Sequence, residues 1–168
     1  MSNRLIAMLV VLVVLLDQLA KAAVVALVPP GGEVTVIPGF FRLVQARNRG
    51  IAFGLFGSSG PLVQTALLAG IVVIVVFLAV QLQRAGQASR LAATGLALVL
   101  GGAIGNLVDR LARGEVVDFL DVYVRWGGAE HHWWTFNVAD SAITVGACLV
   151  ILAELLRGAR ESHVSRPD

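Results

Sequence analysis

The chain has 168 residues, of which 57% are hydrophobic and 14% charged, and its mean hydropathy is +0.82. This composition exceeds what a soluble domain of this size needs to fill its core, and it indicates an integral membrane protein. The formal net charge is only +2 and no long basic run occurs, so we expect no nucleic-acid partner.

Four apolar stretches are long enough to cross a bilayer, which takes about 20 residues. They cover residues 5–28, 61–82, 91–108 and 137–156. We expect helices in all four, because a lipid-exposed backbone must satisfy its own hydrogen bonds. The first stretch also has the layout of a signal peptide, but its apolar character continues to a spanning length, and we expect it to be retained.

The segment 29–60 has a different pattern. Prolines and glycines at 29–32 end the first helix, and residues 33–38 and 40–44 mix β-branched and aromatic residues, which predicts a small sheet outside the membrane. Residues 50–57 are apolar but too short to span, which predicts a short helix at the interface. We therefore expect an all-α membrane protein with one domain over the whole chain and a small extracytoplasmic β-sheet.

Arginines give only weak information on orientation. Arg84 and Arg90 lie in the turn between the second and third spans, and further arginines follow the last span, which favours a cytoplasmic location for these segments. The opposite loops also carry arginines, so the charge bias is nearly balanced. These are Arg42, Arg47, Arg49, Arg110, Arg113 and Arg125.

Two aspartates carry the strongest functional signal, since each lies at the edge of a very apolar segment. Asp118 follows two valines, and Asp140 opens the last apolar stretch. If the two carboxyl groups meet, they cannot both ionise easily, and one keeps a proton. The ionised acid can then activate a water while the protonated acid polarises a peptide carbonyl, which is the chemistry of an aspartic protease.

Further polar residues occur at helical spacing near the same end of the spans. Asp17 and Lys21 are four apart, which is typical of a lysine that reaches the headgroups beside its counter-ion, or of residues that order a site. Asn106 and Arg110 follow a small-xxx-small glycine pattern that favours close helix packing. The adjacent Asp109 and Arg110 are consistent with an interfacial ion pair or with a scaffold for the site.

Asn137 lies three residues before Asp140, so both side chains lie on one helix face. Each residue taken singly could simply cap the helix, because Asn and Asp are good N-terminal residues. The presence of Asp118 across one external loop favours a shared site instead.

Other functions fit the residues less well. The group Asp121, Glu130, His131 and His132 could supply metal ligands, but no His-Glu-x-x-His helix is present, and we expect neither metal nor cofactor. A transporter or proton pathway would need polar residues across the whole bilayer, whereas these gather near one end. A non-catalytic assembly scaffold would tolerate neutral replacements of both acids. The three tryptophans are most simply interfacial anchors.

Five motifs in order resemble those of bacterial lipoprotein signal peptidases, also called signal peptidase II. They are Asp17-Gln18 with Lys21, Asn48-Arg49-Gly50-Ile51-Ala52-Phe53-Gly54, the run from Gly101 to Arg110, Val116-Val117-Asp118-Phe119, and Phe136-Asn137-Val138-Ala139-Asp140-Ser141. The chain departs from the usual pattern at Ile51, and the connection between the two acids is somewhat long.

The resemblance implies an aspartic endopeptidase of the bacterial inner membrane, with its active site at the extracytoplasmic face. It implies cleavage of prolipoproteins before a cysteine that carries a diacylglyceryl group, and inhibition by globomycin-like cyclic peptides. Asp118 and Asp140 fall on the catalytic dyad. The positions implied to order the site or bind substrate are Asp17, Lys21, Asn48, Gly102, Asn106, Arg110 and Asn137. We also expect a β-cradle from residues 29–60, contacts with membrane lipid, and a monomer.

Overall fold

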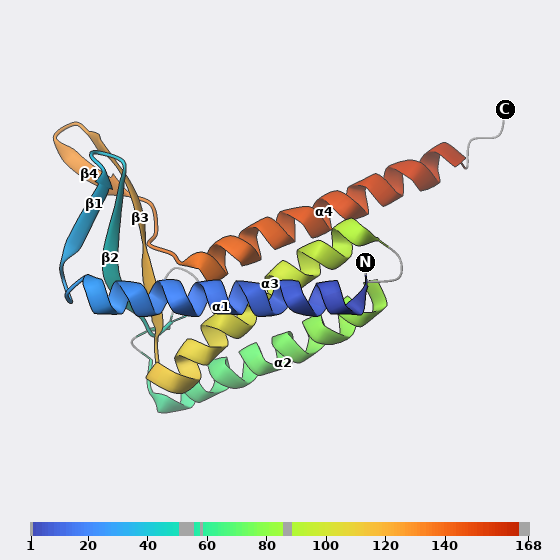
Figure 1. Cartoon of the computed structure of the whole chain (residues 1–168), viewed down its shortest axis with the longest axis horizontal. Coiled ribbons are helices and arrows are strands. Elements are labelled where there is room, and N and C mark those ends of the chain that lie inside the picture. The colour runs from blue at the N-terminus through green and yellow to red at the C-terminus, as the bar shows by residue number, and fades with distance from the viewer. Residues whose placement is uncertain (1, 51–55, 58, 86–88, 165–168) are drawn as a thin grey trace.

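A computed structural model describes residues 2–50, 56–57, 59–85 and 89–164, in which four long helices form a bundle with a sheet at one end (Figure 1). The helices are α1 (Asn3–Leu27), α2 (Pro61–Ala85), α3 (Arg90–Arg113) and α4 (Val138–Val164). The strands are β1 (Glu33–Ile37), β2 (Phe41–Asn48), β3 (Val116–Trp126) and β4 (Ala129–His132).

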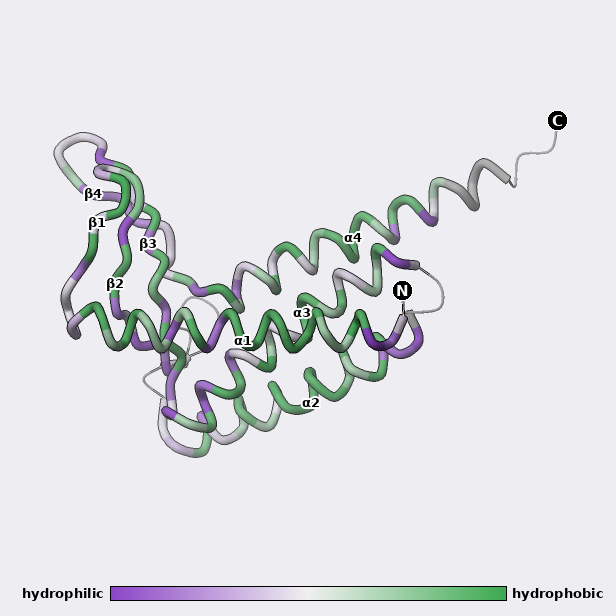
Figure 2. The backbone as a smooth tube through the Cα atoms, viewed as in Figure 1, coloured by the Kyte–Doolittle hydropathy of each residue, from purple (hydrophilic) through white to green (hydrophobic). Residues whose placement is uncertain are grey.

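All four helices are long and apolar enough to cross a membrane. Hydrophobic residues dominate the middle of the bundle, while hydrophilic residues gather at its two ends (Figure 2). The predicted fold class, four membrane-spanning helices with a small antiparallel sheet, is therefore confirmed. Most of the predicted interfacial helix at residues 50–57, namely residues 51–55, lies outside the described residues.

Helix α3 is the centre of the bundle and packs against the other three helices. Its glycines permit this, because a Cβ on Gly101 would lie 2.8 Å from Val13 of α1, and one on Gly105 would lie 2.7 Å from an oxygen of Asp17. A Cβ on Gly102 would overlap the backbone of α4 at Ala139. Small residues on two faces of α3 thus let α1 and α4 each pack closely against α3, as the glycine pattern predicted.

Helix α3 is longer than its apolar stretch, which ends at residue 108. It continues to Arg113 and ends where Gly114 adopts a left-handed conformation and donates its N–H to the carbonyl of Arg110. The prediction that residues 109–113 belong to an external loop was therefore wrong. The helix can continue because the charged side chains of its last turn find partners inside the end of the bundle.

The sheet has the order β1-β2-β3-β4 with antiparallel neighbours. The first two strands were predicted, but β3 and β4 lie in the segment that was interpreted only as an external loop between the third and fourth spans. The strands form a hairpin whose turn is Gly127-Gly128, and both glycines have positive φ, as a two-residue hairpin turn requires. This hairpin accounts for the long connection between Asp118 and Asp140.

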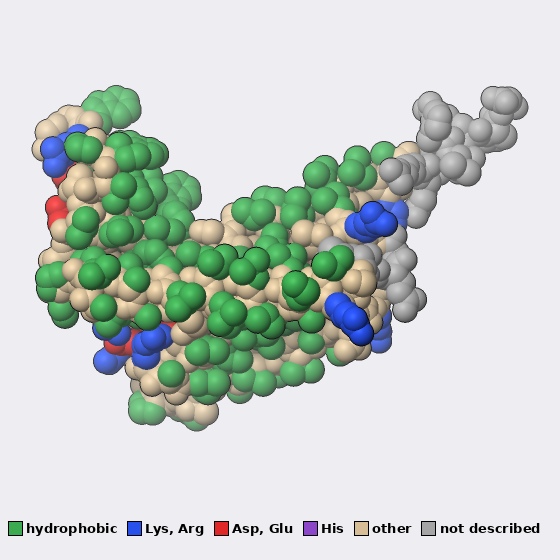
Figure 3. Space-filling view, in the orientation of Figure 1, with side chains coloured by type: hydrophobic (Ala, Val, Ile, Leu, Met, Phe, Trp, Pro, Cys, Tyr) green, Lys and Arg blue, Asp and Glu red, His purple; other side chains and the backbone are tan. Residues whose placement is uncertain are grey.

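The two faces of the sheet differ in polarity. Arg42 of β2 is paired with Glu33 at 2.6 Å and with Asp121 at 2.7 Å, and Glu130 and His132 complete this polar network. On the other face, apolar side chains stay exposed beyond the end of α1, and in the space-filling view hydrophobic atoms cover the side of the sheet toward α4 (Figure 3). Exposed residues of that face are Val34, Val36, Val124 and Trp126.

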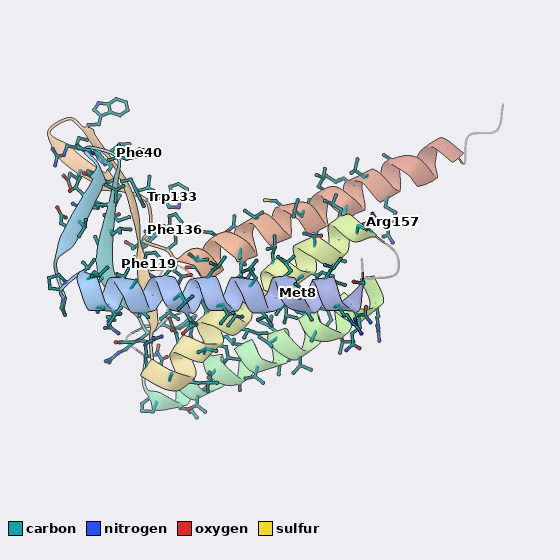
Figure 4. The ribbon with its side chains drawn as sticks, in the orientation of Figure 1. Met8, Phe40, Phe119, Trp133, Phe136 and Arg157 are labelled. Atoms are coloured by element: carbon teal, nitrogen blue, oxygen red, sulfur yellow. The ribbon has the colours of Figure 1, made fainter. Side chains whose placement is uncertain are left out.

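A small core joins the sheet to the bundle. Val24 and Val28 from the end of α1 are buried against Phe119 of β3, with Leu43 of β2 packed beside them. Phe119 lies where β3 passes the end of α1 (Figure 4). Because Phe119 follows Asp118 directly, this core fixes the strand residue next to the first predicted acid.

Candidate active site

Asn137 joins the two predicted acids. Its side-chain amide donates to Oδ1 of Asp118 at 2.7 Å, and its backbone N–H donates to Oδ2 of Asp140 at 3.2 Å. Asn137 is fully buried and Asp118 is 4% exposed, whereas Asp140 is half-buried. The structure thus brings the carboxylates from β3 and α4 into contact with one asparagine.

The same asparagine begins helix α4. Its side-chain oxygen accepts the N–H of Asp140 at 2.9 Å, while Asp140 returns a bond to the N–H of Asn137. This reciprocal pair is an Asn/Asp form of the capping box. The capping alternative is therefore confirmed, and the same asparagine also contacts both of the predicted acids.

Asp118 accepts a second amide. Nδ2 of Asn48 donates to its Oδ2 at 3.0 Å, and Oδ1 of Asn48 accepts the N–H of Gly50 at 2.9 Å, which orients the amide. Burial raises the pKa of Asp118 to about 6, the two asparagine hydrogen bonds oppose this rise, and the charge of Asp140 adds to it. Asp118 can therefore exchange a proton close to neutral pH.

Asp140 receives its side-chain partner from α3. Nδ2 of Asn106 donates to Oδ1 of Asp140 at 2.8 Å, and Oδ1 of Asn106 accepts from Nζ of Lys21 at 2.9 Å. Because an ammonium group can only donate, Lys21 fixes which end of the Asn106 amide faces Asp140.

Lys21 lies inside the protein and does not extend to the headgroups. Its ammonium is fully buried, 2.8 Å from Asp17 and 2.9 Å from Asp109, and both of these acids are also fully buried. The alternative of a lysine that snorkels beside its counter-ion is therefore wrong. A cation with two anions and an amide oxygen around it is well satisfied away from water, which explains its burial so near the helix end.

Arg110 does not pair with its sequence neighbour Asp109. Its Nη2 donates to the carbonyl of Gly50 at 2.6 Å, and its Nη1 donates to the carbonyl of Asn106 at 3.2 Å. Asp109 instead contacts Arg113, one helical turn along. The interpretation of residues 109 and 110 as an interfacial ion pair was wrong, since consecutive helix residues point in different directions. Arg110 ties the end of β2 to α3.

An open cavity of about 750 Å³ lies beside Asp118. Its wall includes Asn48 from β2 and Trp134 from the segment before α4, so it gives access to the first acid from outside the bundle. The remaining lining residues are Ala46, Arg47, Arg49, Gly57, Glu115 and Thr135.

Two further residues, Asp109 and Gln18, hold this site, although the resemblance did not imply a role for either. Asp109 accepts the N–H of Val117 at 3.1 Å, and Gln18 donates to Asp109 at 3.2 Å and to Asp17 at 3.1 Å. The four-residue spacing of Asp109 and Arg113 on one helix would have indicated the first of them.

Within the described residues, no three His, Cys, Asp or Glu side chains come together in a way that could hold a metal ion. His132 lies in the polar network of the sheet, with Nδ1 3.1 Å from Asp121. The acids at the candidate site are held by amides and by the buried Lys21, a set that polarises and orients carboxylates.

The sequence matches the family described as signal peptidase (SPase) II over residues 9–156. The lipoprotein signal peptidase of Solibacter usitatus (strain Ellin6076) is 43% identical over 152 residues, which are 90% of each chain. The lipoprotein signal peptidase of Burkholderia mallei (strain SAVP1) is 46% identical over 155 residues, which are 89% of this chain and 87% of the relative.

Solved structures agree with this similarity. A bacterial membrane enzyme determined by the in meso method at 2.3 Å resolution has a TM-score of 0.76 and 25% identity, and the match covers 99% of this chain and 94% of the other. A second one, at 1.9 Å resolution, has a TM-score of 0.71 and 29% identity over 91% of this chain and 94% of the other.

Proposed function

The chain belongs to the signal peptidase II family, and we propose that it is an aspartic endopeptidase that removes signal peptides from diacylglyceryl-modified prolipoproteins by cleaving before the lipidated cysteine. One observation carries the catalytic part of this proposal. Asp118 and Asp140 converge on the same buried asparagine at the end of the spans, beside an open cavity.

In the proposed mechanism the two carboxyl groups share one proton. The ionised group takes a proton from a water as that water attacks the scissile carbonyl, and the protonated group polarises the carbonyl oxygen and later protonates the leaving amine. The raised pKa of Asp118, about 6, supports a role in proton transfer near neutral pH. The other predicted positions orient these acids through hydrogen bonds and close packing. They are Asp17, Lys21, Asn48, Gly102, Asn106, Arg110 and Asn137.

The site suits a substrate whose lipid stays in the membrane. The dyad lies at the end of the spans next to the sheet, so a diacylglyceryl chain can remain among lipids while the peptide bond reaches water. A partly dry setting also strengthens electrostatic stabilisation of the developing oxyanion. We further propose that one integral-membrane domain acts as a monomer, that globomycin-like cyclic peptides compete for the site, and that no nucleic acid binds.

We place the sheet and the dyad on the extracytoplasmic side of the bacterial inner membrane. Arg4, Arg84 and Arg90 lie at the opposite end of the bundle, as the positive-inside rule expects of the cytoplasmic end. Several arginines at the sheet end are instead paired with acids, including Arg42, Arg49, Arg113 and Arg125. These ion pairs partly offset the positive charge at the sheet end, which supports the proposed orientation.

The direct test uses Asp118→Asn and Asp140→Asn, which keep size but remove a proton-transfer group. Each purified variant should bind substrate and unfold at a temperature close to wild type, yet cleave a diacylglyceryl-modified prolipoprotein undetectably. Asp121→Asn, a buried acid of the same strand that contacts Arg42, is the matched control and should keep activity. Full cleavage by either dyad variant would overturn the assignment.

A further inference from the structure

We infer that Asp109 is a positioning residue for the proposed dyad. It anchors the strand that carries Asp118, and its charge balances the ammonium of Lys21, which orients Asn106, the hydrogen-bond partner of Asp140. This inference rests on the proposed function and deepens it, because the sequence left Asp109 as part of an ion pair or of a scaffold and did not say which groups it holds.

The first half of the inference concerns the strand. Oδ2 of Asp109 accepts the backbone N–H of Val117 at 3.1 Å, the residue immediately before Asp118. Both Asp109 and Val117 are fully buried. This bond crosses the turn between the end of α3 and the start of β3, so it sets where the strand leaves the helix. Any movement of Val117 moves the first acid with it.

The second half concerns charge. The same oxygen of Asp109 lies 2.9 Å from Nζ of Lys21, and that ammonium donates to Asn106, whose amide holds Asp140. One carboxylate oxygen therefore touches both the strand of the first acid and the cation behind the second. Loss of its charge would leave Lys21 with a single buried counter-ion, Asp17, which accepts the N–H of Ala139 at 2.9 Å next to Asp140.

The other oxygen of Asp109, Oδ1, is also hydrogen-bonded, so the carboxylate is held from both sides and cannot rotate freely. It accepts from Gln18 at 3.2 Å and from Arg113. The charged groups in contact with Asp109 are Lys21 of α1 and Arg113 of α3, and Asp17 of α1 is paired with the same Lys21. The other charged groups named at this end of the bundle are Arg110 of α3, Asp118 of β3 and Asp140 of α4, and Arg110 feels the charges of Asp109, Asp118 and Asp140.

Two substitutions separate the two halves of the inference. Asp109→Asn removes the charge but keeps an oxygen that can accept from Val117, so it tests the electrostatic part. Asp109→Ala removes the acceptor as well, so it adds the anchoring part. Asp121→Asn is again the matched control, because it neutralises a buried acid that contacts Arg42 and His132 rather than the site.

The readout is kcat and KM for a diacylglyceryl-modified prolipoprotein across pH, with thermal unfolding measured in the same detergent. In Asp109→Asn, the less balanced Lys21 should favour ionised carboxylates and shift the kcat/KM profile to lower pH, by roughly one unit for a nearby charge at an effective dielectric of about 20. In Asp109→Ala, kcat should also fall on the order of 100-fold with little change in KM, since a displaced acid misaligns the reaction but leaves binding intact.

A wild-type pH profile in folded Asp109→Asn, or a wild-type kcat in folded Asp109→Ala, would overturn the inference. If Asp109→Ala does not fold, the pH profile of Asp109→Asn decides alone. A shift of the same size in Asp121→Asn would also count against it. Failure of the proposed function is distinguishable, because in that case the wild-type protein itself would not cleave the prolipoprotein.

Discussion

Replacing Asn48 by alanine tests the electrostatic environment of the dyad most directly. Asn48 donates to Oδ2 of Asp118 at 3.0 Å, and its hydrogen bond stabilises the ionised carboxylate against the effect of burial. A hydrogen bond to a charged group contributes about 1.5–3 kcal/mol, and one pKa unit corresponds to about 1.4 kcal/mol. Because Asn48 is half-buried and water can partly replace its amide, we expect the lower end of this energy range. The pKa of Asp118 should then rise by about one unit from its value of about 6.

The assay is the pH dependence of kcat/KM for prolipoprotein cleavage. The limb of the profile that reports the titration of Asp118 should move to higher pH by about one unit, since loss of a donor to the carboxylate favours its protonated form. Gln45→Ala is the control, because Gln45 lies on the same strand but its amide faces Val28. A profile of Asn48→Ala that superimposes on wild type, or moves to lower pH, would refute the reasoning.

Two further predictions concern packing and membrane placement. Gly95→Val should destabilise the protein by about 1–3 kcal/mol, because a Cβ at this position would lie 2.6 Å from the carbonyl oxygen of Gly146 on α4. Thermal denaturation measures the effect, and Gly70→Val, whose Cβ would have nothing within 4 Å, should unfold like wild type. Trp126, 79% exposed on the apolar face of the sheet, should be quenched by brominated phospholipid when it is the sole tryptophan. A sole tryptophan introduced by Arg125→Trp lies on the opposite face and should be quenched much less. Equal quenching of the two tryptophans would contradict the prediction, because it would place both faces of the sheet at the same depth in the lipid.

The sequence predicted the spans and the two acids because both signals are local. A stretch such as residues 61–82 has only one stable structure in lipid, and Asp118 and Asp140 are conspicuous beside valines and alanines. The burial of Lys21 could not be predicted in this way. A lysine near a helix end normally reaches water, and only the anions from α1 and α3 that surround it in three dimensions make burial favourable.

The hairpin of β3 and β4 shows a different limit. Its alternating residues and the Gly127-Gly128 turn were present in the sequence, but the segment was predicted only as the external loop that carries Asp118 and Asp121. In the fold those acids are satisfied by Asn48, Asn137 and Arg42, which come from other elements. Polar residues inside a strand are explained only by partners that are remote along the chain.

The direct backbone contact between α3 and α4 has a consequence for how the enzyme meets its substrate. Since Gly95, Gly102 and Gly146 let the two backbones touch, the separation of these helices has little room to adjust by rotamer changes. Asn106 and Asp140 are therefore held at a fixed spacing before any peptide arrives. Binding energy from the substrate need not be used to position Asp140, and can instead be used to align the scissile bond with it.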